Sequence, residues 1–83
     1  MKKTQEELVD VFAQTMKDEL KANEHKGDWR SWNNSVEIIV ELDYHRAKLE
    51  KAMRNNNFSE IKEYLADSAN FLLMLGNAYN LYD

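Results

Sequence analysis

The sequence contains no cysteine and no proline, and its 83 residues include only two glycines, Gly27 and Gly76. Without cysteine there are no disulfides and no thiolate metal sites, so any metal ligands must be carboxylate or imidazole groups. The scarcity of helix-breaking residues indicates long helices. The longest apolar run has five residues, far fewer than a membrane-spanning helix needs. We therefore expect an all-α protein with no membrane partner, located in the cytoplasm.

Size and charge limit the remaining possibilities. A chain of 83 residues makes a single helical domain, 1–83, whose core is small without help from a metal or a second chain. Self-association into a homodimer or tetramer is therefore expected. The net charge of −4 argues against a broad surface for duplex nucleic acid. It leaves room for a nucleotide held by a few cations or by a metal.

Three helix starts can be predicted, with helices over about residues 5–23, 35–55 and 58–80 and a loop over 24–33. Thr4, Asn34 and Asn57 are N-cap residues, and each is followed three residues later by a glutamate. This spacing is typical of a capping box, in which the cap side chain accepts from a first-turn amide. The run of three asparagines ending at Asn57 predicts a tight turn, which makes the last two helices antiparallel neighbours.

Each predicted helix has a stripe of mainly apolar residues at spacings of three and four, as expected for a helix with one buried face. The stripes consist of Leu8, Val11, Phe12, Met16 and Leu20; Ile38, Leu42, His45, Leu49 and Ala52; and Ile61, Leu65, Ser68, Leu72, Leu75 and Tyr79. The third helix is apolar nearly all round in its second half. We predict a three-helix antiparallel amphipathic bundle that completes its core by oligomerisation, although the same face would also serve a different protein partner.

Polar residues interrupt these stripes. Glu41 and His45 lie one turn apart on the second helix, as do Glu63 and Asp67 on the third, with Asn70 three residues further on. Packing the two helices together would bring these groups face to face, and two carboxylates with an imidazole or amide suit Mg²⁺ or Mn²⁺. We predict that Glu41, His45, Glu63 and Asp67 are metal ligands and catalytic residues. The alternatives are a hydrogen-bonded core histidine and a solvated acidic face.

Cations and aromatic rings form a second candidate group. Lys26, Trp29 and Arg30 lie in the loop around Gly27, where ammonium and guanidinium groups can bind phosphates and an indole can stack on a base. Lys48 lies three residues after His45, and with Asn70 it completes the predicted substrate-binding set. Alternatively, the tryptophan covers the core and the lysines are solvated.

Three segments resemble small phage-type MazG-like proteins. Residues 21–29 contain the pattern N-x-H-K-G-x-W, residues 44–49 contain Y-H-x-x-K-L, and residues 63–71 contain E-x-x-A-D-x-A-N-F. The resemblance covers about residues 12–76. It implies an all-α nucleoside triphosphate pyrophosphohydrolase fold in which carboxylates on facing helices hold Mg²⁺. In such enzymes water attacks between the α and β phosphates and releases a nucleoside monophosphate and pyrophosphate.

The chain departs from this family's pattern at the metal site. The hallmark of the family's second helix is a pair of adjacent glutamates with a third glutamate three residues on, but the corresponding stretch from Tyr44 to Lys48 has no carboxylate. On the third helix, Tyr64 stands three residues before Asp67, where an acid is expected. Three hypotheses follow. The chain is a Mg²⁺-dependent pyrophosphohydrolase acting on a (d)NTP, a non-catalytic nucleotide-sequestering module, or a phage interaction protein that binds a host partner in the host cytoplasm.

Overall fold

The computed structural model describes residues 2–26 and 32–83. Three α-helices account for most of them, α1 (Gln5–Ala22), α2 (Ser35–Arg54) and α3 (Phe58–Ala78), and a short 3₁₀ helix, η1 (Glu24–Lys26), follows the first. The described residues include no strand, so the predicted all-α class is confirmed. Within these ranges no helix is long and apolar enough to cross a membrane.

Hydrogen bonds at the N-termini confirm the three predicted helix starts. At α1 the Thr4 hydroxyl accepts from the Glu7 amide at 3.1 Å, and the Glu7 carboxylate accepts from the Thr4 amide at 3.0 Å. The hydrogen bonds from the Thr4 backbone and side chain lower the pKa of Glu7. The side chains of Asn34 and Asn57 accept from first-turn amides of α2 and α3. The helices end one or two residues before their predicted ends.

The turn between α2 and α3 is a Schellman motif centred on Asn56. The Asn57 amide donates to the Ala52 carbonyl at 3.0 Å, and the Asn56 amide donates to the Met53 carbonyl at 3.2 Å. This pattern needs a left-handed residue after the helix, and Asn56 has a φ of 52°. Asparagine tolerates this conformation better than most side chains do. The turn therefore reverses the chain within three residues and sets α2 against α3.

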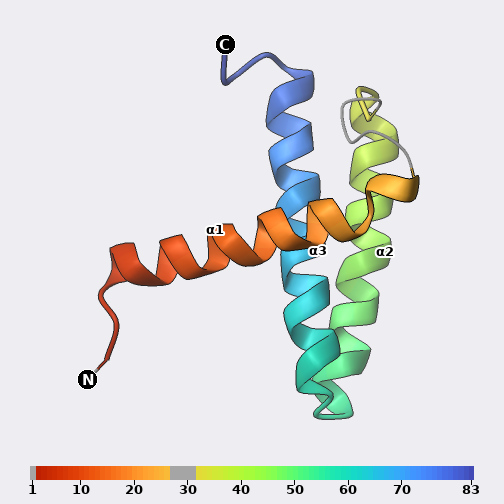
Figure 1. Cartoon of the computed structure of the whole chain (residues 1–83). Helices are drawn as coiled ribbons and strands as arrows, with labels where there is room; N and C mark the ends of the chain where they lie inside the picture. Colours follow the sequence, from red (N-terminus) through yellow and green to blue (C-terminus); the bar gives the residue numbers. More distant parts are fainter. Residues whose placement is uncertain (1, 27–31) are drawn as a thin grey trace.

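Beyond the turn, α2 and α3 run antiparallel and side by side, whereas α1 runs across α3 (Figure 1). The predicted antiparallel arrangement is therefore right for α2 and α3 only. The long connection between α1 and α2 does not force the two helices to be neighbours, because only short loops do so. The N-terminal half of α1 extends past the α2–α3 pair (Figure 1).

The core is small, as the length of the chain predicts. Among the described residues, the buried apolar side chains are Ile38, Ala52, Ala66 and Met74. The α1 helix has no buried residue, and Leu8, Val11 and Phe12 of its predicted stripe are 55%, 51% and 39% exposed. The face of α1 that meets α3 thus continues uncovered toward the N-terminus.

Candidate functional site

His45 lies at the centre of the polar residues that the sequence singled out. Its ring is half-buried against Phe71, at a centroid separation of 4.9 Å, and near Tyr64, at 6.4 Å. Trp32 packs edge-on against the same Phe71 ring at 5.8 Å, so this tryptophan covers the interior. The aromatic packing fixes the plane of the imidazole.

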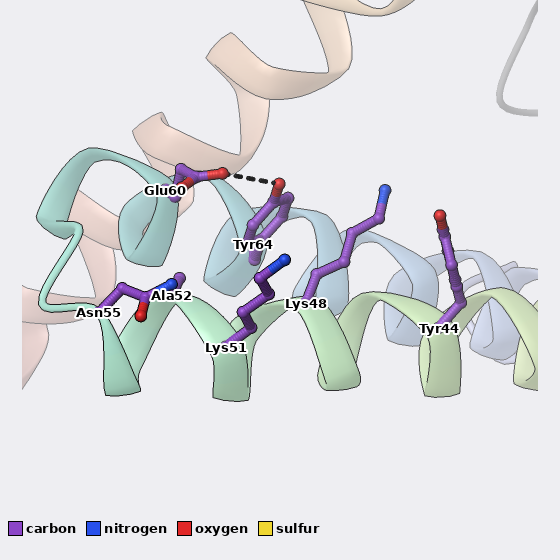
Figure 2. Close-up of a pocket in the computed structure, with 7 residues that line it drawn as sticks. All are labelled: Tyr44, Lys48, Lys51, Ala52, Asn55, Glu60 and Tyr64. Carbon is purple, nitrogen blue, oxygen red and sulfur yellow. Dashed lines mark hydrogen bonds between the residues drawn. The ribbon is translucent and has the colours of Figure 1, made fainter.

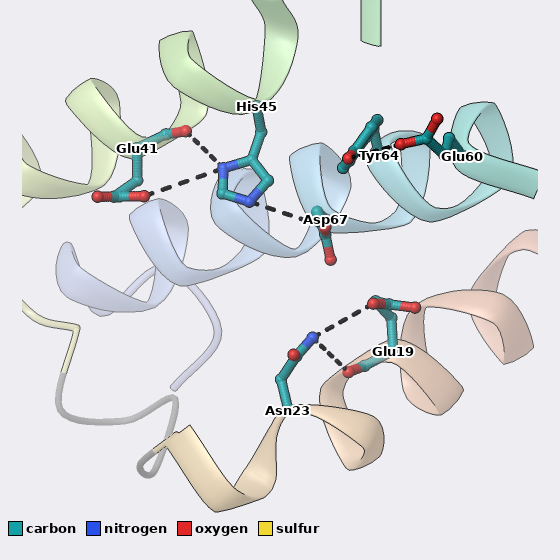
Figure 3. Close-up of polar contacts among 7 residues, drawn as sticks. All are labelled: Glu19, Asn23, Glu41, His45, Glu60, Tyr64 and Asp67. Atoms are coloured by element: carbon teal, nitrogen blue, oxygen red, sulfur yellow. Dashed lines mark hydrogen bonds and ion pairs between the residues drawn. The ribbon is translucent and has the colours of Figure 1, made fainter. Parts of the chain in front are cut away.

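One hydrogen bond fixes the proton on that imidazole. His45 Nδ1 lies 2.9 Å from the Glu41 carbonyl oxygen, one turn earlier on α2. A carbonyl oxygen only accepts, so Nδ1 carries the proton and donates it. In the neutral ring, Nε2 therefore presents a lone pair. It faces Asp67 Oδ2 of α3 at 3.7 Å (Figure 3), which is too long for a hydrogen bond.

Asp67 also belongs to a cluster of carboxylates from two helices. Glu19 of α1 and Glu63 and Asp67 of α3 each offer an oxygen, and the three oxygens lie within 4.8 Å of one another. Like charges this close repel one another unless a proton or a cation lies between them. The predicted pair Glu63 and Asp67 is therefore brought together, with a third carboxylate that the sequence analysis did not include.

Two asparagines position α1 and its glutamate. The side-chain amide of Asn23 donates to the Glu19 carbonyl at 3.0 Å and to its carboxylate at 3.3 Å (Figure 3). Asn70 of α3 is only 3% exposed, and its side-chain nitrogen donates to the Met16 carbonyl at 3.0 Å. Asn70, predicted to bind substrate, thus ties α1 to α3 one turn from Glu19. Its buried Oδ1 has no hydrogen-bond partner among the described residues.

The other predicted site residues take different positions. The Glu41 carboxylate lies beyond His45, 3.9 Å from Nδ1 (Figure 3), and is not part of the cluster of three. Lys48 is a residue of α2, and its Nζ lies 4.3 Å from the centre of the Tyr44 ring. Trp29, Arg30 and the side chain of Lys26 lie outside the described residues.

Glu19 was missed because the prediction placed the site between the second and third helices alone. A signal for it was present: Glu19 follows Met16 by three residues and precedes Asn23 by four, so it continues the inward face of α1. A carboxylate in line with an apolar stripe is costly to bury unless it is paired. The same argument had pointed to Asp67 on α3.

The donor set fits a hard divalent cation. Opposite oxygen ligands are roughly 4.2 Å apart around Mg²⁺ and about 4.6–5.2 Å apart around Ca²⁺. Carboxylate oxygens within 4.8 Å therefore suit either ion after, at most, a small closing movement. The 3.7 Å between His45 Nε2 and Asp67 Oδ2 also allows both atoms to bind one ion at about 2.1 Å. A ring nitrogen whose partner N–H donates to a backbone carbonyl is the usual form of a metal-binding histidine.

A tyrosine next to the cluster responds to the same negative charge. The Tyr64 hydroxyl donates to Glu60 Oε2 at 3.1 Å (Figure 3). Partial burial raises the pKa of Tyr64, and the bond to Glu60 and the nearby carboxylates of Glu63 and Asp67 raise it further. Tyr64 therefore stays a neutral hydrogen-bond donor beside the cluster.

Comparison with known proteins adds no relative. No family model, no curated protein and no solved structure matches this chain. The resemblance to MazG-like proteins therefore stays a prediction.

Proposed function

We propose that the junction of the three helices binds a divalent cation, Mg²⁺ or Mn²⁺, and through it the phosphates of a nucleoside triphosphate. The observation that carries this proposal is the convergence of three carboxylates with a histidine nitrogen whose lone pair faces one of them. A cation would satisfy the three carboxylates at once. In this reading Glu19, Glu63 and Asp67 are the ligands, His45 would join them through Nε2 beside Asp67 after a small movement, and Glu41 acts through its backbone carbonyl.

The reaction that best fits such a site is pyrophosphohydrolysis of a (d)NTP, as the MazG resemblance implies. A bound cation would neutralise phosphate charge and make a water molecule more acidic. Water would form a bond to the α phosphorus as the bond to the bridging oxygen breaks, giving a nucleoside monophosphate and pyrophosphate. Glu63 is the exposed member of the cluster. We assign to its carboxylate the proton that the attacking water loses.

A second candidate function, binding of a nucleotide without cleavage, is favoured by the charge of the site. The α2 positions where the family has glutamates hold Tyr44, His45 and Lys48. The cluster therefore carries three carboxylates, which suffice for one divalent cation and fall short of the acids that a two-metal site needs. Such a protein would sequester its nucleotide.

A panel of canonical and modified nucleotides, each with and without Mn²⁺, separates these functions. Ligand binding to the folded form raises the free energy of unfolding by RT ln(1 + [L]/Kd) and thereby raises the melting temperature, and pyrophosphate release reports cleavage. A metal-dependent shift with pyrophosphate release supports the enzyme, and a shift without it supports the binder. Asp67→Asn should abolish either response. No shift and no pyrophosphate across the panel would overturn both functions.

We also propose that a second copy of the chain covers the exposed stripe of α1, which consists of Leu8, Val11 and Phe12. This stripe continues the face by which α1 meets α3, so the two copies would extend one apolar interior. Fifteen large apolar side chains of the described residues are at least 39% exposed, which is unusual for a stable monomer of this size.

A further inference from the structure

A pocket separate from the carboxylate cluster opens between the second half of α2 and the first half of α3 (Figure 2). Its volume of about 370 Å³ falls in the range of sites for small ligands. It is lined by Tyr44, Lys48, Lys51, Ala52, Asn55, Glu60 and Tyr64. Glu19, Glu63 and Asp67 take no part in it, so the pocket is separate from the candidate cation ligands.

The pocket carries a local excess of positive charge in an acidic protein. The side chains of Lys48 and Lys51 extend from α2 toward the same side (Figure 2), and neither forms an ion pair with any described carboxylate. Glu60, the acid in the lining, is occupied by hydrogen bonds from Tyr64 and Asn57. Two ammonium groups without a carboxylate partner are suited to a phosphate.

Aromatic rings surround the first of these lysines. Lys48 Nζ lies 4.3 Å from the centre of the Tyr44 ring and 5.7 Å from that of Tyr64. Both distances are within the range of a cation–π attraction, which holds the ammonium group over the pocket. The Tyr44 side chain remains 58% exposed, so part of its ring is free to contact a planar ligand. Stacking of a base on such a ring contributes roughly 1–3 kcal/mol.

From this geometry we infer that the pocket is a metal-independent site for a nucleoside monophosphate, with the phosphate on Lys48 and Lys51 and the base against Tyr44. The inference goes beyond the proposed function, because it does not need the cluster to bind a cation. It concerns the class of molecule that pyrophosphohydrolysis would release. Failure of the protein to catalyse that reaction would not contradict the inference, and failure of the inference would not contradict the reaction.

Calorimetric titration with AMP, GMP, CMP and UMP in excess EDTA tests the inference. At least one nucleotide should bind, and inorganic phosphate and the matching nucleoside should each bind more weakly. Lys48→Gln and Lys51→Gln should each weaken binding about tenfold, the effect of losing one charged contact. Lys62→Gln, which removes the same charge from α3 outside the lining, should leave the affinity unchanged. Added salt should weaken binding to the wild-type protein.

The aromatic part of the inference has its own pair of variants. Tyr44→Ala should weaken nucleotide binding more than phosphate binding, because it removes the stacking ring as well as the ring that holds Lys48, whereas Tyr44→Phe, which keeps the ring, should bind both as the wild type does. Circular dichroism confirms that each variant is folded. Absence of binding by all four nucleotides in EDTA overturns the inference. So does binding that survives in Lys48→Gln and Lys51→Gln, or phosphate that binds as tightly as the nucleotide.

Discussion

His45 Nε2 and Asp67 Oδ2 face each other at 3.7 Å across α2 and α3, while His45 Nδ1 is held 2.9 Å from the Glu41 carbonyl. Because Nδ1 must donate to that carbonyl, the neutral ring sets a lone pair against a carboxylate oxygen. A proton on Nε2 or a cation between the two atoms removes this conflict. Glu19 and Glu63 lie beside Asp67, and in the proposed function a cation is bound there.

Mutation can separate the proposed role of His45 as a metal ligand from the role of Glu41, which orients the His45 ring through its backbone carbonyl. His45→Phe keeps an aromatic ring against Phe71 but removes both nitrogens, so Mn²⁺ affinity should fall by about tenfold to a hundredfold. Glu41→Gln is the matched control, because its backbone carbonyl still orients His45 and its carboxylate lies outside the cluster. The affinity of this variant should stay near that of the wild type. An equal loss in both variants would mean that the Glu41 carboxylate is itself a ligand.

The turn between α2 and α3 predicts opposite effects of two substitutions at one position. Asn56 has a φ of 52°, which glycine adopts freely and alanine does not. Asn56→Ala should lower the free energy of unfolding by about 1 kcal/mol, and Asn56→Gly should keep or raise it. Urea denaturation measures both. Asn55→Ala, at a negative φ, is the control and should change stability less than Asn56→Ala.

Much of the architecture follows from such local signals. The caps at Thr4, Asn34 and Asn57 and the stripe periodicity predict three helices, and the asparagine turn predicts that α2 and α3 are antiparallel. The direction of α1 was not predictable, because it depends on the Asn70 side chain reaching the Met16 carbonyl. That contact joins residues 54 positions apart, and no local pattern encodes it.

The same limit applies to the candidate site. Spacing of three and four placed Glu63 and Asp67 on one face and His45 opposite them, and the structure brings His45 and Asp67 together. Glu19 enters the cluster only because α1 crosses α3. The Glu41 carboxylate lies outside the cluster, because Glu41 contacts the His45 ring through its backbone carbonyl, one turn earlier on α2.

Tyr64 predicts a loss of stability at alkaline pH. Folding raises the pKa of Tyr64 above its ordinary value of 10.0, so between that value and the folded pKa the unfolded chain binds fewer protons than the folded chain. Stability therefore falls as pH rises through this window, and the contribution is fully present below it. Urea denaturation between pH 8 and 11 should show that Tyr64→Phe loses this part of the slope. Identical slopes for wild type and variant would contradict the assignment.

The exposed stripe of α1 predicts concentration-dependent self-association. Phe12→Glu places a charge on the face proposed to meet the second copy, so sedimentation should show a shift from dimer or larger species toward monomer. Lys17→Glu is the control, since Lys17 is exposed and lies about 140° around the helix from Phe12, away from the stripe. If the wild-type chain is monomeric at all concentrations, the stripe is not an interface between two copies, and a different protein would be its partner. Equal effects of both variants would argue against a defined interface.

Titration of Mn²⁺ followed by electron paramagnetic resonance tests the cation site most directly. The wild-type protein should bind one ion per chain, and both Glu19→Gln and Asp67→Asn should lose that ion while staying folded. Asp18→Asn, which removes the same charge from the neighbouring position on α1, should bind as the wild type does. If Mn²⁺ does not bind the wild-type chain, or binds Glu19→Gln and Asp67→Asn as tightly, the junction of the three helices is not a cation site.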